Sequence, residues 1–323
     1  MKRATLACLI PAVAAWTPQP SLRVSRSAMR SSMDDSWPSD SSDEVTEYNG
    51  YGVEDAVILD ADPEGALLQL AAYTARGEAA TASERNQARS LVAQIEASAS
   101  EQAVDAAAVE GTWELVFADT QLFRSSPFFM AGRAVCETPE DAKKYDWFCD
   151  MHRAALAIST IERVRQVVSA NQLVSEFEVR VGAVPFVNLP LMGSGGLPIA
   201  ITGSLVSTAD IVGRPSDGSL ELLMDSVEVK GSNVPGLRAL LDNGLKLDTR
   251  AVADALEDNL PKVRTPIFRT TYVDSRLRVS RDQDDKIFVY SKISSDTQPT
   301  DYSTAPADLG LSALVNGLQT AFF

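Results

Sequence analysis

The chain has 323 residues, of which 45% are hydrophobic, which is enough for one large folded domain or two small ones. Its formal net charge of −15 argues against a duplex nucleic-acid partner, because such a partner's phosphates need compensating Lys and Arg. The single histidine, His152, excludes metal sites built from several histidines. We therefore expect a folded protein without a nucleic-acid partner and without a bound metal.

Residues 1–33 have the composition of a two-part targeting leader. Lys2 and Arg3 precede a short apolar run that suits signal-peptidase cleavage after Ala15, and residues 16–33 carry three Arg and five Ser but no acid. A signal peptide followed by a transit peptide predicts a plastid (chloroplast) protein, in a secondary plastid; a plain secretory signal is the alternative. Cleavage would leave 24 basic against 44 acidic side chains, which disfavours docking on anionic lipid by charge alone.

An acidic linker and a helical hairpin come next. Residues 34–56 are acidic and rich in Ser, Gly and Pro, which is typical of a disordered segment. Within residues 57–108, Asp62 before a proline predicts the start of one helix, and Thr81 with Glu84 forms the capping box of a second. The two apolar stripes cannot bury each other fully, so we expect the hairpin to pack on the rest of the fold.

Residues 109–292 predict a small antiparallel barrel. Apolar and polar side chains alternate over eight segments, and eight strands make a barrel with room for one ligand. An even number of strands also lets the first and the last pair, which removes exposed edges. The fold class is therefore mainly β (α+β), a lipocalin-like barrel preceded by the hairpin. The expected strands are residues 112–119, 152–159, 162–169, 172–182, 200–212, 219–230, 270–281 and 286–291.

Two excursions interrupt the strands. Residues 121–151 are rich in aromatic side chains, and residues 235–260 have helical spacing; either could cap a mouth of the barrel, or simply complete the core. The first excursion also contains Cys136 and Cys149. In the reducing interior of a plastid these are two free thiols or, alternatively, a redox-controlled disulfide that fixes the loop.

The tail, residues 293–323, ends in an uncharged amphipathic stretch over 309–323. Fifteen residues are too few to span a bilayer, so we expect no transmembrane segment. The stretch either docks on the protein as a last helix or lies on a lipid surface.

Several segments taken together resemble one known family. They are LLQLAAYTARG at 67–77, GTWELVF at 111–117, SSPFF at 125–129, and YVDSRLRVSR with FVY within 272–290. In this order they are similar to the plastid lipid-associated proteins, also called plastid fibrillins, over residues 63–290. The resemblance implies a protein that binds apolar plastid lipids, such as prenylquinones, carotenoids or fatty acyl chains, at plastoglobules or thylakoids. We expect neither enzymatic activity nor a cofactor.

Two other functions stay open. A structural coat protein of plastid lipid bodies would keep its barrel packed and hold no internal ligand. A lipid- or pigment-modifying enzyme would need a polar cluster in the barrel, for which His152 with a carboxylate is the candidate. No carboxylates recur at a spacing that singles out an acid and a base, and no glycine-rich phosphate loop is present in the sequence.

Alternation also predicts which side chains meet a ligand. Inward positions of the strands and the aromatic excursion supply them. They are Trp113, Leu115, Phe117, Phe123, Phe128, Phe129, Phe177, Val179, Val181, Met224 and Phe288. Asp274 and Arg278 lie four residues apart on one predicted strand, so we expect an ion pair that holds the barrel closed. The segment is a signature of the resembled family, although Ser275 and Arg276 replace its usual acidic pair.

Overall fold

The computed structural model describes residues 62–99, 104–181, 201–236, 238–244, 246–248 and 266–309. The described residues all fall within one compact unit. The predicted leader and linker lie outside the described residues, and so does the predicted terminal helix apart from Leu309. Those three assignments stay predictions.

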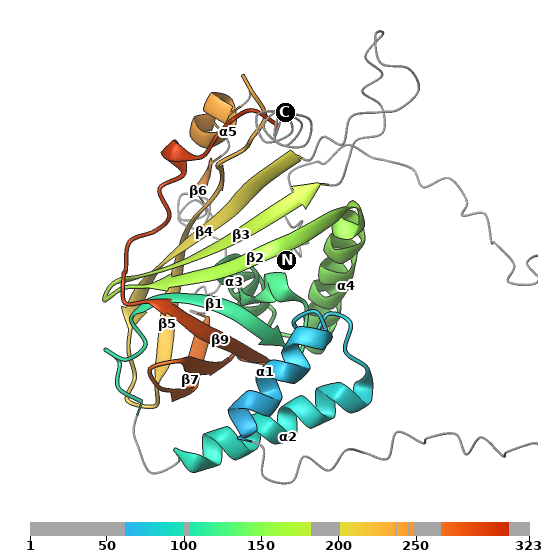
Figure 1. The fold of residues 1–323 in the computed structure, drawn as a ribbon, viewed down its shortest axis with the longest axis vertical. Helices are drawn as coiled ribbons and strands as arrows, with labels where there is room; N and C mark the ends of the chain where they lie inside the picture. Colours follow the sequence, from blue (N-terminus) through green and yellow to red (C-terminus); the bar gives the residue numbers. More distant parts are fainter. Residues whose placement is uncertain are drawn as a thin grey trace, which may run out of the picture. The chain divides into compact units, whose positions relative to one another are not determined.

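Eight strands close into one antiparallel barrel, which confirms the predicted fold class (Figure 1). They are β1 (Gly111–Ala118), β2 (Ser159–Val168), β3 (Gln172–Val181), β4 (Ile201–Gly213), β5 (Ser219–Lys230), β7 (Ile267–Val273), β8 (Leu277–Arg281) and β9 (Ile287–Ser294). Each strand pairs with the next in this order, and β9 returns to β1, so the ring has no free edge. A short strand, β6 (Lys246–Asp248), adds to β5 beyond its pairing with β7.

Strand β3 shows how the sequence sets the two faces of the wall. Leu173 and Phe177 are buried in the barrel core, and Val179 packs against it. Glu178, which lies between two of these inward positions, faces outward and has its carboxylate 4.0 Å from the guanidinium of Arg163 on β2. Because side chains alternate along a strand, this pattern places the apolar face inside.

A helical hairpin covers the outer wall at β8 and β9. Helix α1 (Pro63–Tyr73) begins at the Asp62 cap, and α2 (Ala82–Ser98) begins at the predicted Thr81–Glu84 capping box. Their apolar stripes bury a second cluster against the outward side chains of β8 and β9, and Figure 1 shows both helices beside the lower part of the barrel. Glu96 of α2 adds an ion pair of 2.9 Å with Arg281 of β8. The prediction that the hairpin packs on the barrel is confirmed.

A short helical segment enters the barrel after β1. It consists of η1 (Leu122–Ser125) and α3 (Pro127–Ala134), and we call residues 122–134 the plug. Phe129 and Met130 of the plug belong to the same buried cluster as the inner face of the barrel. Helix α4 (Pro139–Ala155) follows and packs Tyr145 and Cys149 onto that cluster. The aromatic excursion therefore both caps a mouth and completes the core.

Charged contacts hold the plug at the turn between β8 and β9. Asp284 of this turn lies 3.1 Å from the guanidinium of Arg124 and 2.8 Å from that of Arg133. Arg124 also lies 3.9 Å from Asp282. The plug is thus fixed to the strand pair that carries the hairpin on its other side.

Three expected elements were wrong in detail. The strand expected at 152–159 is the end of α4 followed by η2 (Leu156–Ile158), because the Thr138 cap and Pro139 start a helix of 17 residues. The strand expected at 270–281 is two strands, β7 and β8, joined by a turn. The helical stretch expected at 235–260 contains α5 (Arg238–Gly244) but also β6, and its residues after 248 lie outside the described ranges.

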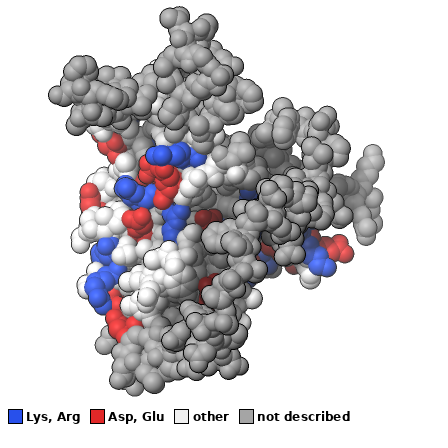
Figure 2. Space-filling model, turned by 45° about the vertical axis from the view of Figure 1, so that its right-hand side comes forward, with Lys and Arg blue, Asp and Glu red and all other residues white. Residues whose placement is uncertain are grey.

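Cysteines and charges complete the description of the surface. Cys136 is partly exposed and Cys149 is buried, and the two do not form a disulfide bond. Figure 2 shows Lys and Arg side chains beside Asp and Glu on the face it draws, without a large patch of one sign. Within the described ranges, no helix has the length and apolar character needed to cross a membrane.

Leu70→Ala and Leu68→Ala test the docking of the hairpin. Leu70 is 2% exposed and lies in the hairpin cluster, whereas Leu68 on the same helix is 40% exposed. We expect Leu70→Ala to lower the free energy of unfolding by about 2–5 kcal/mol and Leu68→Ala to change it by less than about 1 kcal/mol. Urea denaturation measures both; equal losses would contradict the packing described for α1.

Candidate functional site

The inner face of the barrel holds most of the predicted ligand-binding residues. Six of them are buried in the interior cluster: Trp113, Leu115, Phe123, Phe129, Phe177 and Phe288. Three more are partly buried and pack against it: Phe128, Val179 and Met224. Val181, the last described residue of β3, is partly exposed and belongs to neither cluster. The interior is thus an aromatic and aliphatic core, as the alternation predicts.

Phe117 is not inside, and its predicted place was wrong. The pairing of β1 with β9 shifts register between Leu115 and Phe117, so the alternation breaks there. Phe117 consequently faces outward, where it is fully buried beneath the helical hairpin. Its role is to join the hairpin to the wall.

A belt of polar side chains crosses this apolar interior. Gln166 of β2 lies opposite Ser175 of β3, which in turn lies opposite Ser207 of β4. Each of the three side chains belongs to a residue that is at most 1% exposed. The plug contacts the same belt, because the Ser126 hydroxyl lies 2.9 Å from the Ser207 hydroxyl and the Gln166 amide donates to the Ser125 carbonyl at 3.2 Å. The plug therefore reaches the middle of the barrel.

Arg278 is the charged member of the belt. Its side chain is fully buried, and it lies on β8 opposite Tyr290 of β9. The guanidinium carbon is 4.3 Å from the ring centroid of Tyr290 and 5.0 Å from that of Trp113. Its Nη2 donates to the side-chain oxygen of Gln166. Stacking of this kind holds a guanidinium by its faces and leaves hydrogen bonding to its edges.

Much of the hydrogen-bonding capacity of this cluster is unused. Among the described residues, none accepts from Nε or Nη1 of Arg278, and none pairs with the hydroxyls of Tyr290 or Ser175. The Tyr290 hydroxyl lies close to Ser125 and Gln166, but without the geometry of a hydrogen bond. Buried polar atoms almost always have partners, so four unpaired atoms in one belt identify it as the unusual part of the interior.

The charge of Arg278 is also uncompensated. Burial lowers its pKa from 12.5 to about 10, and the nearby Tyr290 hydroxyl offsets this only in part. The side chain is therefore protonated at neutral pH, yet no described Asp or Glu forms an ion pair with it. Burial also raises the pKa of Tyr290, so that hydroxyl stays neutral and able to donate. A second cation, the Lys292 ammonium, lies 4.9 Å from the Trp113 ring centroid.

The ion pair predicted between Asp274 and Arg278 does not form. A turn separates the two residues, and Arg278 is directly opposite Val273 across it. The Asp274 carboxylate instead accepts from the backbone nitrogens of Arg276 at 2.7 Å and Leu277 at 2.6 Å, which fixes the turn. Asp274 is structural, as expected, but with different partners.

Sequence alternation missed Gln166, Ser175 and Tyr290 as site residues. A signal existed, because Gln166 and Ser175 occupy inward positions between apolar neighbours on their strands. A polar residue at an inward position of a strand predicts a buried group that requires a hydrogen-bond partner, and this pattern can be recognised from the sequence.

His152 lies on α4 rather than on a strand, and it does not form a catalytic pair. Its ring centroid is 4.7 Å from that of Phe123, 5.1 Å from that of Phe129 and 6.3 Å from that of Phe148. No described carboxylate is hydrogen-bonded to it. Burial among these rings lowers its pKa from the ordinary 6.5. His152 therefore packs α4 against the plug.

This burial makes the stability of the plug depend on pH. Because the folded state lowers the pKa of His152, the unfolded state binds more protons as pH falls below about 6.5. The contribution of neutral His152 is complete above that pH and is lost below it. We expect the urea midpoint to fall from pH 7.5 to pH 5.5 in the wild type and to fall less in His152→Phe. Equal pH slopes in the two proteins would contradict the assignment.

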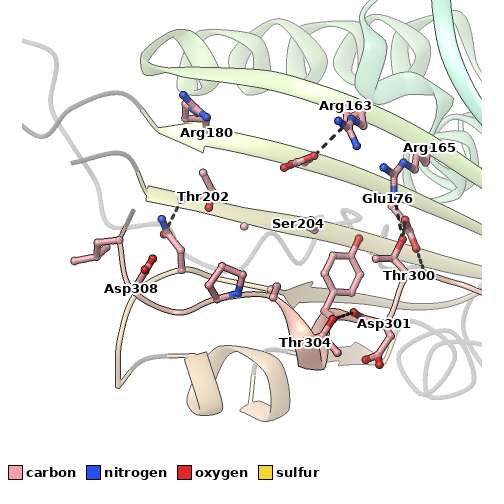
Figure 3. A pocket seen from close by; sticks show the side chains of 18 residues that line it. Arg163, Arg165, Glu176, Arg180, Thr202, Ser204, Thr300, Asp301, Thr304 and Asp308 are labelled. Carbon is pink, nitrogen blue, oxygen red and sulfur yellow. Dashed lines mark hydrogen bonds and ion pairs between the residues drawn. The ribbon is translucent and has the colours of Figure 1, made fainter. Parts of the chain in front are cut away.

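Two cavities among the described residues lie outside the barrel core. A groove of about 590 Å³ is formed by the outer faces of β2, β3 and β4 and by residues 300–309 (Figure 3). Thr300 closes one side through hydrogen bonds of 2.8 and 2.6 Å to Glu176. A second cavity, of about 440 Å³, lies between the hairpin loop at Gly77 and the edge of the plug at Phe123.

The first groove does not have the chemistry of a lipid or anion site. Its three arginines, Arg163, Arg165 and Arg180, are matched by four acids, Glu176, Glu178, Asp301 and Asp308. Figure 3 shows Arg163, Arg165, Glu176 and Arg180 on the strands, with Asp301 and Asp308 on the C-terminal segment opposite them. The uncompensated charge is inside the barrel, so we place the candidate site there.

Comparison with known proteins adds no assignment. No protein-family model matches the chain, and no curated protein or solved structure matches it significantly. The likeness to the plastid lipid-associated proteins therefore rests on the sequence segments alone.

Proposed function

We propose that this chain is a plastid lipid-binding protein whose barrel shelters one lipid molecule. The observation that carries the proposal is the closed eight-stranded barrel with an aromatic and aliphatic inner face, a size that suits one small ligand. The sequence resemblance supplies the ligand class: prenylquinones, carotenoids or fatty acyl chains, at plastoglobules or thylakoids. The predicted leader would direct the chain to a plastid.

The plug is the part that a ligand would displace. It fills the interior through Phe129 and Met130. Two hydrogen bonds tie Ser125 and Ser126 to the inner wall, and Arg124 and Arg133 hold its edge at the turn between β8 and β9. The second cavity already borders the plug at Phe123. Lipid entry would replace apolar contacts of the plug with apolar contacts of the ligand. The apolar area buried by the barrel wall, worth about 25 cal/mol per Å², would therefore change little.

A coat protein without an internal ligand is the second candidate. It is favoured by the complete burial of interior side chains such as Trp113, Leu115 and Phe288 in this structure. A barrel that stays packed would bind lipid bodies only through its surface. The two candidates differ in whether a lipid is bound in a fixed ratio to the protein.

Lipid extraction separates the two candidates. The full chain is incubated with a plastid lipid extract, purified again, extracted with organic solvent and examined by mass spectrometry. We expect one lipid class at close to one molecule per chain. Binding to liposomes with no lipid retained in a fixed ratio would support the coat protein and contradict the carrier.

Two phenylalanines of opposite faces serve as matched variants. Phe177 is on the inner face of β3, and Phe117 is on the outer face of β1 under the hairpin. Each change to Ala removes a buried ring and lowers the free energy of unfolding by about 3–5 kcal/mol. We expect only Phe177→Ala to alter the amount or the kind of lipid retained. Equal effects of the two variants would mean that retention reports stability rather than an internal site.

A further inference from the structure

We propose that Arg278 binds the carboxylate of an acyl-chain ligand inside the barrel. This inference rests on the proposed lipid-binding function and names the chemical class of the ligand. The belt of Gln166, Ser175, Arg278 and Tyr290 would hold the head group, and the apolar cluster would hold the hydrocarbon chain.

The first argument is charge. Removing an ion from water costs several kcal/mol unless an opposite charge and hydrogen bonds compensate for it. Arg278 is fully buried and protonated at neutral pH, and the described residues give it no carboxylate. An anion inside the barrel would neutralise this charge, whereas water would satisfy only the N–H groups.

The second argument is geometry. Trp113 and Tyr290 stack against the guanidinium, so a ligand approaches Arg278 from its edge. One edge position is used by Gln166, while Nε and Nη1 remain as donors. The neutral Tyr290 hydroxyl is a third donor without a partner among the described residues. Nε–H and Nη1–H lie on different edges of the guanidinium, so one carboxylate oxygen would accept from one of them and the other oxygen from the Tyr290 hydroxyl.

The third argument distinguishes between lipid head groups. A carboxylate carries one negative charge and balances the one charge of Arg278. A phosphate monoester carries about −1.5 to −2 at neutral pH and would leave negative charge in an apolar interior. A quinone or carotenoid oxygen is neutral and would leave the guanidinium uncompensated. The cluster therefore selects a fatty-acid-like molecule from the lipid classes proposed above.

Binding of matched ligands tests the proposal. The full chain is titrated with radiolabelled dodecanoic acid, methyl dodecanoate and dodecyl phosphate by equilibrium dialysis at pH 7.5. We expect the acid to bind at least about 10-fold more tightly than the ester, since hydrogen bonds to a buried charge supply the difference. In Arg278→Met the acid should lose about 10-fold or more in affinity, and the ester should bind as before.

Arg281→Met is the matched control. Arg281 lies on the same strand, but it faces outward and pairs with Glu96 and Asp285. We expect this variant to keep the preference for the acid and to lose stability, because an ion pair is broken. Arg278→Met should instead keep or raise the urea midpoint of the ligand-free protein, since it removes a buried charge without a partner. A purely structural Arg278 would give the opposite result, a lower midpoint with unchanged acid preference.

Each outcome of the titration decides between the proposals. If the wild type binds acid and ester equally, the lipid-binding function stands and the role of Arg278 is refuted. Tighter binding of dodecyl phosphate than of dodecanoate would assign the site to phosphate and refute the carboxylate. If none of the three ligands binds, the barrel does not bind acyl chains, and both the lipid-binding function for this ligand class and the role of Arg278 are refuted. These results come from the wild type, so they do not depend on the folding of a variant.

Discussion

The buried charge of Arg278 is the constraint on which the interior of the barrel depends. A guanidinium can be kept away from water only if other groups replace its hydration. Here Trp113 and Tyr290 cover its faces and Gln166 takes one edge, so side chains of β1, β2 and β9 are arranged around one residue of β8. The plug contacts the same belt through Ser125 and thereby closes the interior over the charge.

The helical hairpin explains why this arrangement is possible. Strands β8 and β9 are buried on both faces, because Leu277, Val279, Ile287 and Val289 point outward into the hairpin cluster. Apolar burial outside thus holds in place the strands that carry polar groups inside. The ion pair between Glu96 of α2 and β8 adds to this contact. The hairpin supports the site without touching it.

The sequence predicted the barrel, the hairpin and most interior residues, because alternation and helix capping are local signals. It could not predict which face of β8 is inside. In a half-exposed strand, Leu277 and Val279 would face inward and Arg278 outward, but the hairpin makes the outer face the apolar one. The bulge that turns Phe117 outward and the turn that separates Asp274 from Arg278 are likewise set by tertiary pairing rather than by spacing. These long-range contacts place the charge of Arg278 inside the barrel, so the spacing of residues in the sequence alone did not reveal the site.

The most direct test of the central claim observes the guanidinium itself. In the full chain labelled with ¹⁵N at arginine Nε, the Arg278 signal can be assigned by its loss in Arg278→Lys, and its position reports the partner of the Nε–H group. We expect one equivalent of dodecanoate to move this signal to the position of a charge-assisted hydrogen bond, and dodecanol to leave it in place. Dodecanoate that binds in a one-to-one ratio while the Arg278 signal stays unmoved would contradict the account.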